Sequence, residues 1–325
     1  MDNLKYIRER LKQARHVVAL TGAGMSQASG LPTFRDAADG LWNQYFASEV
    51  ATAAALQRDP QKVWQWLRAL VQEMNVALPN AGHIALGQLE QRCKVTVVTQ
   101  NVDNLHERAA STEVIHLHGN AYAYCCMDCA RPMTMPPGPV PDWETLSHAV
   151  RCSHCDGKIR HDVVLFNEIV DATRMEQARI AIQTADAVLV IGTSGLIYPA
   201  ATLPQYALEL QKYVVEINPE DTPLSVVASA RIKGMAGISL VELLSDDAPA
   251  TSERQDSEAQ FKEHAQVMLV HALPELGLEP GTVGAIAHCY VGGVNFEVEF
   301  LSPNGKTIGV VTLYGDDLRL LGDDT

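Results

Sequence analysis

The sequence has no long apolar run and no secretory signal. None of its apolar stretches approaches the roughly 20 residues that a membrane-spanning helix needs, and residues 1–5 lack the basic-then-apolar pattern of an export signal. Seven cysteines, four of them in Cys-x-x-Cys pairs, are more typical of a reducing compartment than of an exported protein. The sequence therefore predicts a cytoplasmic protein with no membrane partner.

Basic residues are also scarce, most of all near the C-terminal end. The net charge is −14, of which residues 245–260 carry −4 and residues 261–325 carry −6. Binding to a nucleic-acid backbone needs clustered Lys and Arg, so this acidity argues against a nucleic-acid partner. It favours a protein partner or substrate delivery for residues 261–325, and a passive appended domain is the alternative.

Short apolar runs alternate with helical patterns through the first 244 residues. The runs predict buried strands at 16–20, 95–98, 187–191 and 213–217, and the patterns predict helices at 4–14, 61–78 and 173–184. This alternation predicts a Rossmann-like, doubly wound parallel sheet of the α/β class. Near-continuous apolar strands fit that fold, because helices cover both faces of its sheet.

Three segments do not follow this alternation of strands and helices. Residues 122–160, rich in Pro and Cys, predict a small zinc-binding insertion held by metal more than by a core. Residues 245–260 have the composition of an acidic linker. Residues 261–325 contain closely spaced short strands separated by glycine-rich turns, which predict a small all-β, SH3-like barrel. We therefore expect an α/β domain over 1–244, then the linker over 245–260, then the barrel over 261–325.

Four thiols in two pairs form the strongest motif. Cys126 and Cys129 are followed after 22 residues by Cys152 and Cys155, and two such pairs suit one tetrahedral Zn²⁺. Cys125 is an alternative first ligand, but its spacer to Cys129 would be three residues instead of two. A closed site of four thiolates has no open position for water, so the zinc is expected to be structural.

Glycines and hydroxyls follow the first predicted strand. In Gly22-Ala23-Gly24, with Ser26 close behind, glycines would let backbone N–H groups approach a pyrophosphate. A tight turn without a ligand is the alternative. Phe34 and Arg35 could shield a reactive face and clamp a phosphate, or be a core Phe beside a surface Arg.

Polar residues also follow the other predicted strands. Strand ends in one register would line one crevice for one extended ligand. The residues concerned are Gln100, Asn101 and Asp103 after the second strand, Gly192, Thr193 and Ser194 after the third, and Asn218 after the fourth. Asn101 or Asp103 could instead cap a helix.

His118 stands out among three neighbouring histidines. Gly119 would let the chain turn at a strand end and expose the His118 ring, which can act as a base near neutral pH. His106 and His116 are expected to be structural.

Together these motifs resemble the sirtuin family of NAD-dependent protein deacylases, over residues 1 to about 244. The likeness rests on the glycine loop, on Gln100-Asn101-Val102-Asp103, on His118-Gly119 and on the four cysteines. It implies a catalytic His118 with Asn101 and Asp103, and structural zinc. It also implies NAD contacts by Gly22, Ala23, Gly24, Ser26, Thr33, Phe34, Arg35, Gln100, Asn101, Asp103, Gly192, Thr193, Ser194, Asn218 and Ala236.

The resemblance implies removal of acyl groups from protein lysine, most simply acetyl. The acyl group would pass to ADP-ribose, with release of nicotinamide. Protein ADP-ribosyl transfer or NAD hydrolysis would use the same cofactor site, and a largely inactive NAD-sensing protein is a further alternative.

The acyl and peptide sites depart from the family pattern. Thr33 resembles the branch that removes acidic acyl groups, yet the Tyr and Arg of that branch align with Leu67 and Leu70, and Arg68 is out of register. An apolar pocket floor therefore favours acetyl or aliphatic acyl groups over succinyl. Val163, Leu165 and Phe166 lie in the strand expected to pair with the substrate backbone. Asn167 stands where the family usually has Gly, and Asn tolerates left-handed backbone angles.

Overall fold

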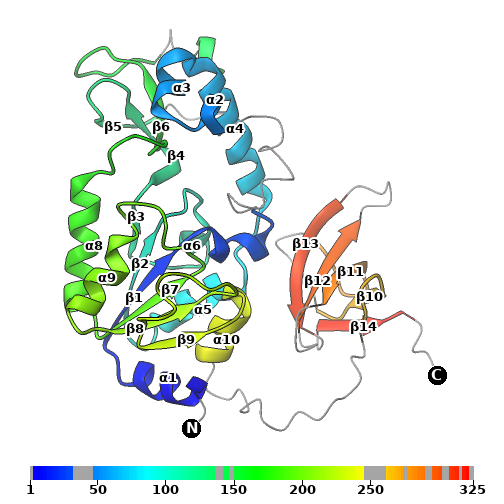
Figure 1. Cartoon of the computed structure of the whole chain (residues 1–325). Coiled ribbons are helices and arrows are strands. Elements are labelled where there is room, and N and C mark those ends of the chain that lie inside the picture. The colour runs from blue at the N-terminus through cyan, green and yellow to red at the C-terminus, as the bar shows by residue number, and fades with distance from the viewer. Residues whose placement is uncertain are drawn as a thin grey trace. The chain divides into compact units, whose positions relative to one another are not determined.

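The computed structural model describes residues 3–31, 47–135, 142–145, 150–244, 261–271, 273, 277–289, 295–301, 307–314 and 317–321. Two compact units follow one another along the chain, with the boundary after Leu244 (Figure 1). The expected linker, 245–260, lies outside the described residues. None of the described helices is both long enough and apolar enough to cross a membrane.

A six-stranded sheet forms the centre of the first unit, in the order β3-β2-β1-β7-β8-β9. All neighbouring strands in it are parallel. The strands are β1 (His16–Thr21), β2 (Lys94–Thr99), β3 (Val114–His116), β7 (Ala187–Ile191), β8 (Tyr213–Ile217) and β9 (Ala230–Ile232). The doubly wound parallel sheet is confirmed. The sequence does not reveal β3 and β9, because strands of three half-buried residues carry no apolar run.

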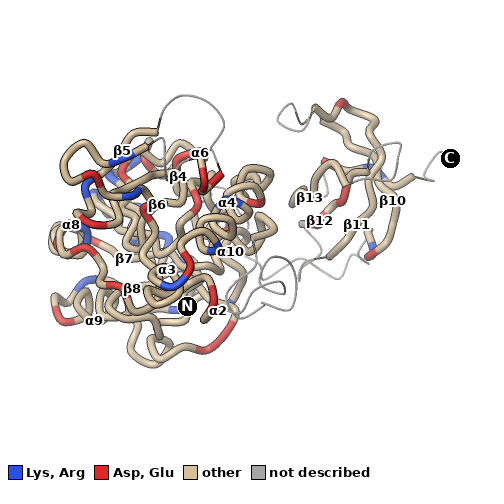
Figure 2. The backbone as a smooth tube through the Cα atoms, turned by 90° about the horizontal axis from the view of Figure 1, so that it is seen from above, with Lys and Arg blue, Asp and Glu red and all other residues tan. Residues whose placement is uncertain are grey.

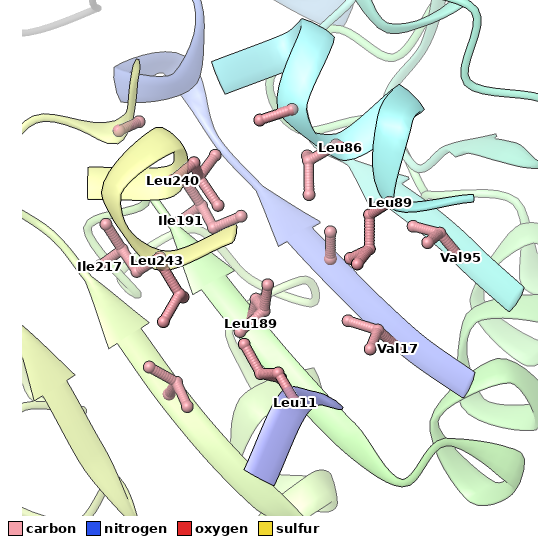
Figure 3. Packing of buried hydrophobic residues seen from close by; sticks show 14 of the residues in the cluster. Leu11, Val17, Leu86, Leu89, Val95, Leu189, Ile191, Ile217, Leu240 and Leu243 are labelled. Carbon is pink, nitrogen blue, oxygen red and sulfur yellow. The ribbon is translucent and has the colours of Figure 1, made fainter. Parts of the chain in front are cut away.

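Helices cover both faces of this sheet. Alternate strand residues point to opposite faces, so Val17 and Ala19 pack on one side and Val18 and Leu20 on the other. Figure 3 shows the first side, where Leu11, Leu86 and other helix residues meet the strands. The helices of that side are α1 (Asn3–Lys12), α5 (Ala81–Leu89) and α10 (Ala236–Leu244). Those of the second side are α8 (Ala172–Thr184) and α9 (Thr202–Glu209).

A smaller region joins two chain segments that lie far apart in the sequence. Its helices are α2 (Ala47–Val50), α3 (Ala53–Arg58) and α4 (Pro60–Val76). They share one buried cluster with a three-stranded antiparallel sheet of order β5-β4-β6. Its strands are β4 (Gly119–Cys126), β5 (Pro132–Met133) and β6 (Ile159–Val163). The remaining short elements of the unit are the 3₁₀ turns η1 (Ala23–Met25) and η2 (Gln27–Ser29), and helix α6 (Leu105–Arg108).

The cysteine-rich region also contains a cluster of packed aromatic side chains. Trp64 of α4 is 2% exposed and its ring centroid lies 4.5 Å from His161 and 6.0 Å from Trp143. Tyr124 packs against both Trp64 and His161. The region therefore has an aromatic cluster in addition to its four thiols, and the expectation that metal stabilises it more than a core does stays a prediction. The sequence hides this core because one of its tryptophans comes from α4, outside the cysteine-rich segment.

The second unit is a five-stranded antiparallel sheet in the order β13-β12-β11-β10-β14. Its strands are β10 (Gln266–Leu269), β11 (Val283–Cys289), β12 (Asn295–Leu301), β13 (Thr307–Tyr314) and β14 (Leu318–Leu320). Phe296, Val298 and Phe300 are fully buried on its inner face. The all-β prediction is confirmed, although β10 and β14 are not apparent from the sequence. Figure 2 shows few basic segments in this unit.

Candidate functional site

The strand ends of the parallel sheet meet through backbone hydrogen bonds. The amide of Gly22, after β1, donates to the Ile191 carbonyl of β7 (3.0 Å). The Gly24 amide donates to Gly192 O (2.9 Å), and the Gly192 amide donates to Ile217 O of β8 (3.0 Å). These bonds hold the loops after β1, β7 and β8 together at the carboxyl edge of the sheet, where such folds bind ligands.

Glycine is required where these loops touch. A Cβ on Gly22 would lie 2.8 Å from Gly192 O, and one on Gly24 would lie 2.8 Å from the Gly192 Cα. Gly192 has φ +58°, and its Cβ would lie 2.6 Å from the Gly24 carbonyl carbon. Side chains are therefore excluded from this contact, which explains the glycine pattern without requiring a ligand.

A polar chain connects the glycine loop to the loop after β2. Asn101 Nδ2 donates to Gly22 O (3.1 Å) and to Ser26 Oγ (3.0 Å). Ser26 Oγ in turn donates to Asp103 Oδ2 (3.0 Å). Burial raises the pKa of Asp103, while bonds from Leu105 N and Ser26 oppose the rise. Asp103 Oδ1 accepts from the Leu105 amide (3.1 Å) at the start of α6, but the N-cap of that helix is Asn104, so neither Asn101 nor Asp103 is the capping residue.

Thr193 connects two further strand ends. Gln100 Nε2 donates to Thr193 Oγ1 (2.9 Å), and Asn218 Nδ2 donates to Thr193 O (2.9 Å). Asn218 Oδ1 accepts from the Glu220 amide (3.1 Å). The structure thus brings together Gln100, Thr193 and Asn218, which the sequence placed on separate strands.

His118 is held in one tautomer. Its Nδ1 lies 3.0 Å from the Gln100 carbonyl oxygen, which can only accept, so Nδ1 carries the proton and Nε2 keeps a lone pair. Burial lowers the pKa of His118, partly opposed by the bond to Gln100. The ring is therefore neutral near pH 7 and able to accept a proton at Nε2. It is half-buried, less exposed than the sequence suggested.

Gly119 lies where His118 meets the segment 163–166, which is expected to pair with the substrate backbone. Gly119 has φ +82°, and a Cβ there would lie 1.9 Å from Asp162 O, so β4 and β6 touch at this point. The next residue after β6, Val164, donates its amide to His118 O (2.8 Å). The candidate base and the segment 163–166 are thus held together by the backbone.

His106 and His116 have partners of their own. His106 Nε2 lies 3.1 Å from Thr21 Oγ1, and His106 is 1% exposed. His116 Nε2 pairs with Glu107 Oε1 (2.7 Å), and its Nδ1 lies 3.2 Å from Asn101 O. Both fit the structural role expected of them.

Asn80 is a site residue that the sequence reading missed. It is 7% exposed, and its Nδ2 donates to Met25 O (2.8 Å) at the end of the glycine loop. Its Oδ1 accepts from Gly82 N and His83 N, while His83 Nδ1 accepts from Asn80 N in a capping box. Asn before an apolar helical run is a known start signal, and this one also anchors the loop.

The acyl-site candidates form one apolar cluster. Leu67, Val163 and Leu165 are buried together, and Leu70 packs against them half-buried. Phe166 differs, being 39% exposed. The structure therefore brings four of the five residues together and leaves the fifth at the surface.

Asn167 forms the turn after Phe166, at a position where the family usually has glycine. Asn167 has φ +67°, the left-handed angle that Asn was expected to tolerate. The Glu168 carboxylate pairs with Arg160 (2.5 Å) and accepts from the Leu165 amide (2.8 Å). The phenylalanine's backbone bonds to Ala51 O and Ala53 N, which fixes the segment against α3.

The four predicted zinc ligands lie together. The sulfurs of Cys126, Cys129, Cys152 and Cys155 lie within 4.8 Å of one another. Two pairs are 3.4 and 3.7 Å apart, close to the edge of about 3.8 Å that a tetrahedron with Zn–S bonds of about 2.3 Å requires. Cys125 is outside the group, so Cys126 is the ligand candidate and this donor set fits Zn²⁺.

The remaining predicted contacts have mixed outcomes. Ala23 is exposed, Ser194 is half-buried near Thr193, and Ala236 is buried at the start of α10. Thr33, Phe34 and Arg35 lie outside the described residues.

Comparisons with known proteins agree with this geometry. Residues 22–199 match the model of the Sir2 family, and residues 263–320 match a domain of unknown function, DUF4926. An NAD-dependent protein deacylase of Thermus thermophilus is 40% identical over 248 residues, which cover 74% of this chain and 94% of that protein. An NAD-dependent protein deacylase of Mycolicibacterium smegmatis is 43% identical over 230 residues, covering 70% and 95%.

Solved structures show the same likeness. A Sir2 homologue in complex with NAD is 36% identical with a TM-score of 0.64, and the match covers 74% of this chain and 92% of that one. A Sir2 protein bound to a propionylated peptide is 28% identical with a TM-score of 0.61, covering 74% and 97%.

Fold and site define a Rossmann-like, dinucleotide-binding class with a four-cysteine region. Within that class, the match over most of the length of these relatives decides the family. The chain belongs to the Sir2 family.

The four-thiol group predicts that Cys152 is needed for zinc binding and that Cys125 is not. Replacing Cys152 with Ser should abolish stoichiometric zinc, because a Cys₃ set binds far more weakly, and should lower the thermal midpoint of the purified protein. Cys125→Ser is the matched control and should keep one zinc per chain. Metal analysis and circular dichroism measure both outcomes, and full zinc content in Cys152→Ser would contradict the assignment.

Proposed function

We propose that the protein is an NAD-dependent lysine deacylase, and that its main activity is deacetylation. The observation that carries the proposal is His118, whose protonated Nδ1 leaves Nε2 basic at the edge where Gln100 and Asn101 meet the glycine loop. The names of the relatives support the same activity.

In this proposal each group has one task. Bound NAD would supply an electrophilic ribose carbon, with nicotinamide as the leaving group and the acyl oxygen of the substrate as the nucleophile. Asn101 and Asp103, fixed by Ser26 and the Gly22 carbonyl, orient the ribose and amide groups. His118 Nε2 accepts the proton of a ribose hydroxyl, which then attacks the acyl carbon. With one water consumed, the products are free lysine, nicotinamide and O-acyl-ADP-ribose.

The substrate peptide has a proposed place as well. Residues 163–166 run out of β6 beside His118, held by Val164 N and by the Phe166 backbone. An extended peptide could add its backbone to this strand, which would bring an acyl-lysine to the base. Substrates are therefore proteins with acylated lysine.

The proposed organisation follows the sequence reading. Residues 1–244 would form the catalytic domain, 245–260 a linker, and 261–325 a domain that binds a protein partner. Unpaired thiols at all seven cysteines favour a reducing compartment, so the proposed location is the cytoplasm. The proposal excludes nucleic acid as a partner on grounds of charge.

Product analysis tests the activity. Full-length protein with NAD and an acetyl-lysine peptide should release nicotinamide, deacetylated peptide and O-acetyl-ADP-ribose in equal amounts. His118→Asn should lower kcat by about 100-fold or more, the range of a lost general base, while the Kd for NAD changes little. Mass spectrometry separates the alternatives, since free ADP-ribose without deacetylation means hydrolysis and ADP-ribosylated protein means transfer. No turnover at all would favour a sensing role.

The apolar cluster predicts the acyl preference. A succinyl carboxylate beside Leu67 and Leu70 would be buried without a partner, at a cost of several kcal/mol, roughly. We expect kcat/KM for acetyl-lysine to exceed that for succinyl-lysine by about 100-fold or more. In Leu67→Tyr/Leu70→Arg the ratio should fall, because a phenol and a guanidinium then meet the carboxylate. Comparable rates of the unaltered protein on both peptides would refute the assignment.

A further inference from the structure

The outward face of the second unit's sheet carries two glutamates, of which Glu299 has apolar neighbours on both adjoining strands. Ala285 of β11, Glu299 of β12 and Val310 of β13 lie side by side in register. Glu297 shares their face, two residues before Glu299, and lies opposite His288 of β11. Val310 is 48% exposed. Ala285, Glu297, Glu299 and Val310 are called the Glu297–Val310 face below.

The two glutamates differ from the paired acids of the same unit. Glu263 pairs with His288 (2.7 Å) and Asp317 with His271 (3.4 Å). In the described part of the unit no basic side chain pairs with Glu297 or Glu299, and Glu299 accepts only the Thr307 hydroxyl (2.6 Å). Both glutamates are half-buried, and the apolar neighbours of Glu299 strengthen the attraction of a cation to its carboxylate.

β13 adds an open edge beside this face. Among the described residues β13 pairs with β12 alone. Its sequence, Thr-Ile-Gly-Val-Val-Thr-Leu-Tyr, has no charged residue and no proline. Proteins usually protect edge strands with such residues or with β-bulges, because an unprotected edge accepts another strand. A bulge interrupts the pairing with β12 between Thr307 and Gly309, so residues 310–314 are the part of β13 suited to strand addition.

We propose that β13 and the Glu297–Val310 face bind an extended, lysine-bearing segment of the protein substrate as an added strand. Strands lie about 4.8 Å apart, so β12 lies about 10 Å from an added strand. A lysine stem lying over Val310 then brings its ammonium group to Glu299 or Glu297. The docked lysine is an unmodified one, because acylation removes its charge.

This inference extends the proposed function, but docking itself needs no catalysis. Binding can therefore be measured on the full-length protein without NAD. The probe is a fluorescent synthetic peptide that alternates Lys with Val and Thr and contains no acyl-lysine. Anisotropy should show Glu297→Gln/Glu299→Gln binding it about fivefold or more weakly than the unaltered protein. Glu279→Gln/Asp317→Asn is the matched control, removing the same charge away from β12 and β13, and should change the Kd by less than about twofold.

Two results would overturn the docking site. One is that both double variants weaken peptide binding equally, or that neither does. The position of the two glutamates would then not matter for binding. The other is equal binding of a peptide of the same charge whose prolines prevent strand pairing. Circular dichroism of each variant checks that the second unit is folded.

Kinetics separate this inference from the proposed function. An acetyl-lysine peptide joined by a flexible linker to the probe segment should have a KM about fivefold lower than the acetyl-lysine peptide alone. Glu297→Gln/Glu299→Gln should remove that difference and leave kcat unchanged. Intact binding without any turnover would reject the deacylase proposal and leave the docking site standing, and turnover with no effect of the segment on KM would reject docking.

Discussion

The contact between the glycine loop and Gly192 is the constraint on which the site depends. Gly22 and Gly24 donate backbone N–H groups to Ile191 and Gly192, at separations that leave no room for a Cβ. This contact fixes the loops after β1 and β7 as one surface. The Gly22 carbonyl is then free to accept from Asn101, which brings in the loop after β2. The polar contacts from Asn101 through Ser26 to Asp103 therefore depend on this close backbone contact.

The zinc-ligand candidates and the candidate base His118 are separate sites connected by the strand β4. β4 begins at Gly119, directly after His118, and ends at Cys126, a zinc-ligand candidate. The Trp64 cluster includes Tyr124 of β4 and His161 of β6. The backbone bond from Val164 N to His118 O connects the end of β6 to the candidate base. In the proposed function, zinc in a closed set of four thiolates would stabilise the fold, and His118 would carry out the proton transfer.

Much of the fold could be predicted from the sequence, because long buried elements leave clear patterns. The runs that became β1, β2, β7 and β8 are mostly apolar, since both faces of the sheet are covered, and β7 is wholly so. Short strands such as β9 leave no pattern, and the Trp64–Trp143 packing joins distant segments that no local pattern connects. For the site, motif spacing indicated Asn101, Asp103 and the thiols. Asn80 was hidden because its capping pattern gives no hint that the same amide also reaches Met25 O.

Titration of NAD into the protein with Gly192→Ala tests the central claim most directly. At φ +58° and with a Cβ 2.6 Å from the Gly24 carbonyl carbon, the alanine must push the two loops apart. Gly195→Ala is the matched control, because Gly195 also has a positive φ but has nothing within 4 Å of its Cβ. Calorimetry should show Gly192→Ala weakening the Kd for NAD by about tenfold or more relative to that control. Unchanged NAD affinity in Gly192→Ala would contradict the account.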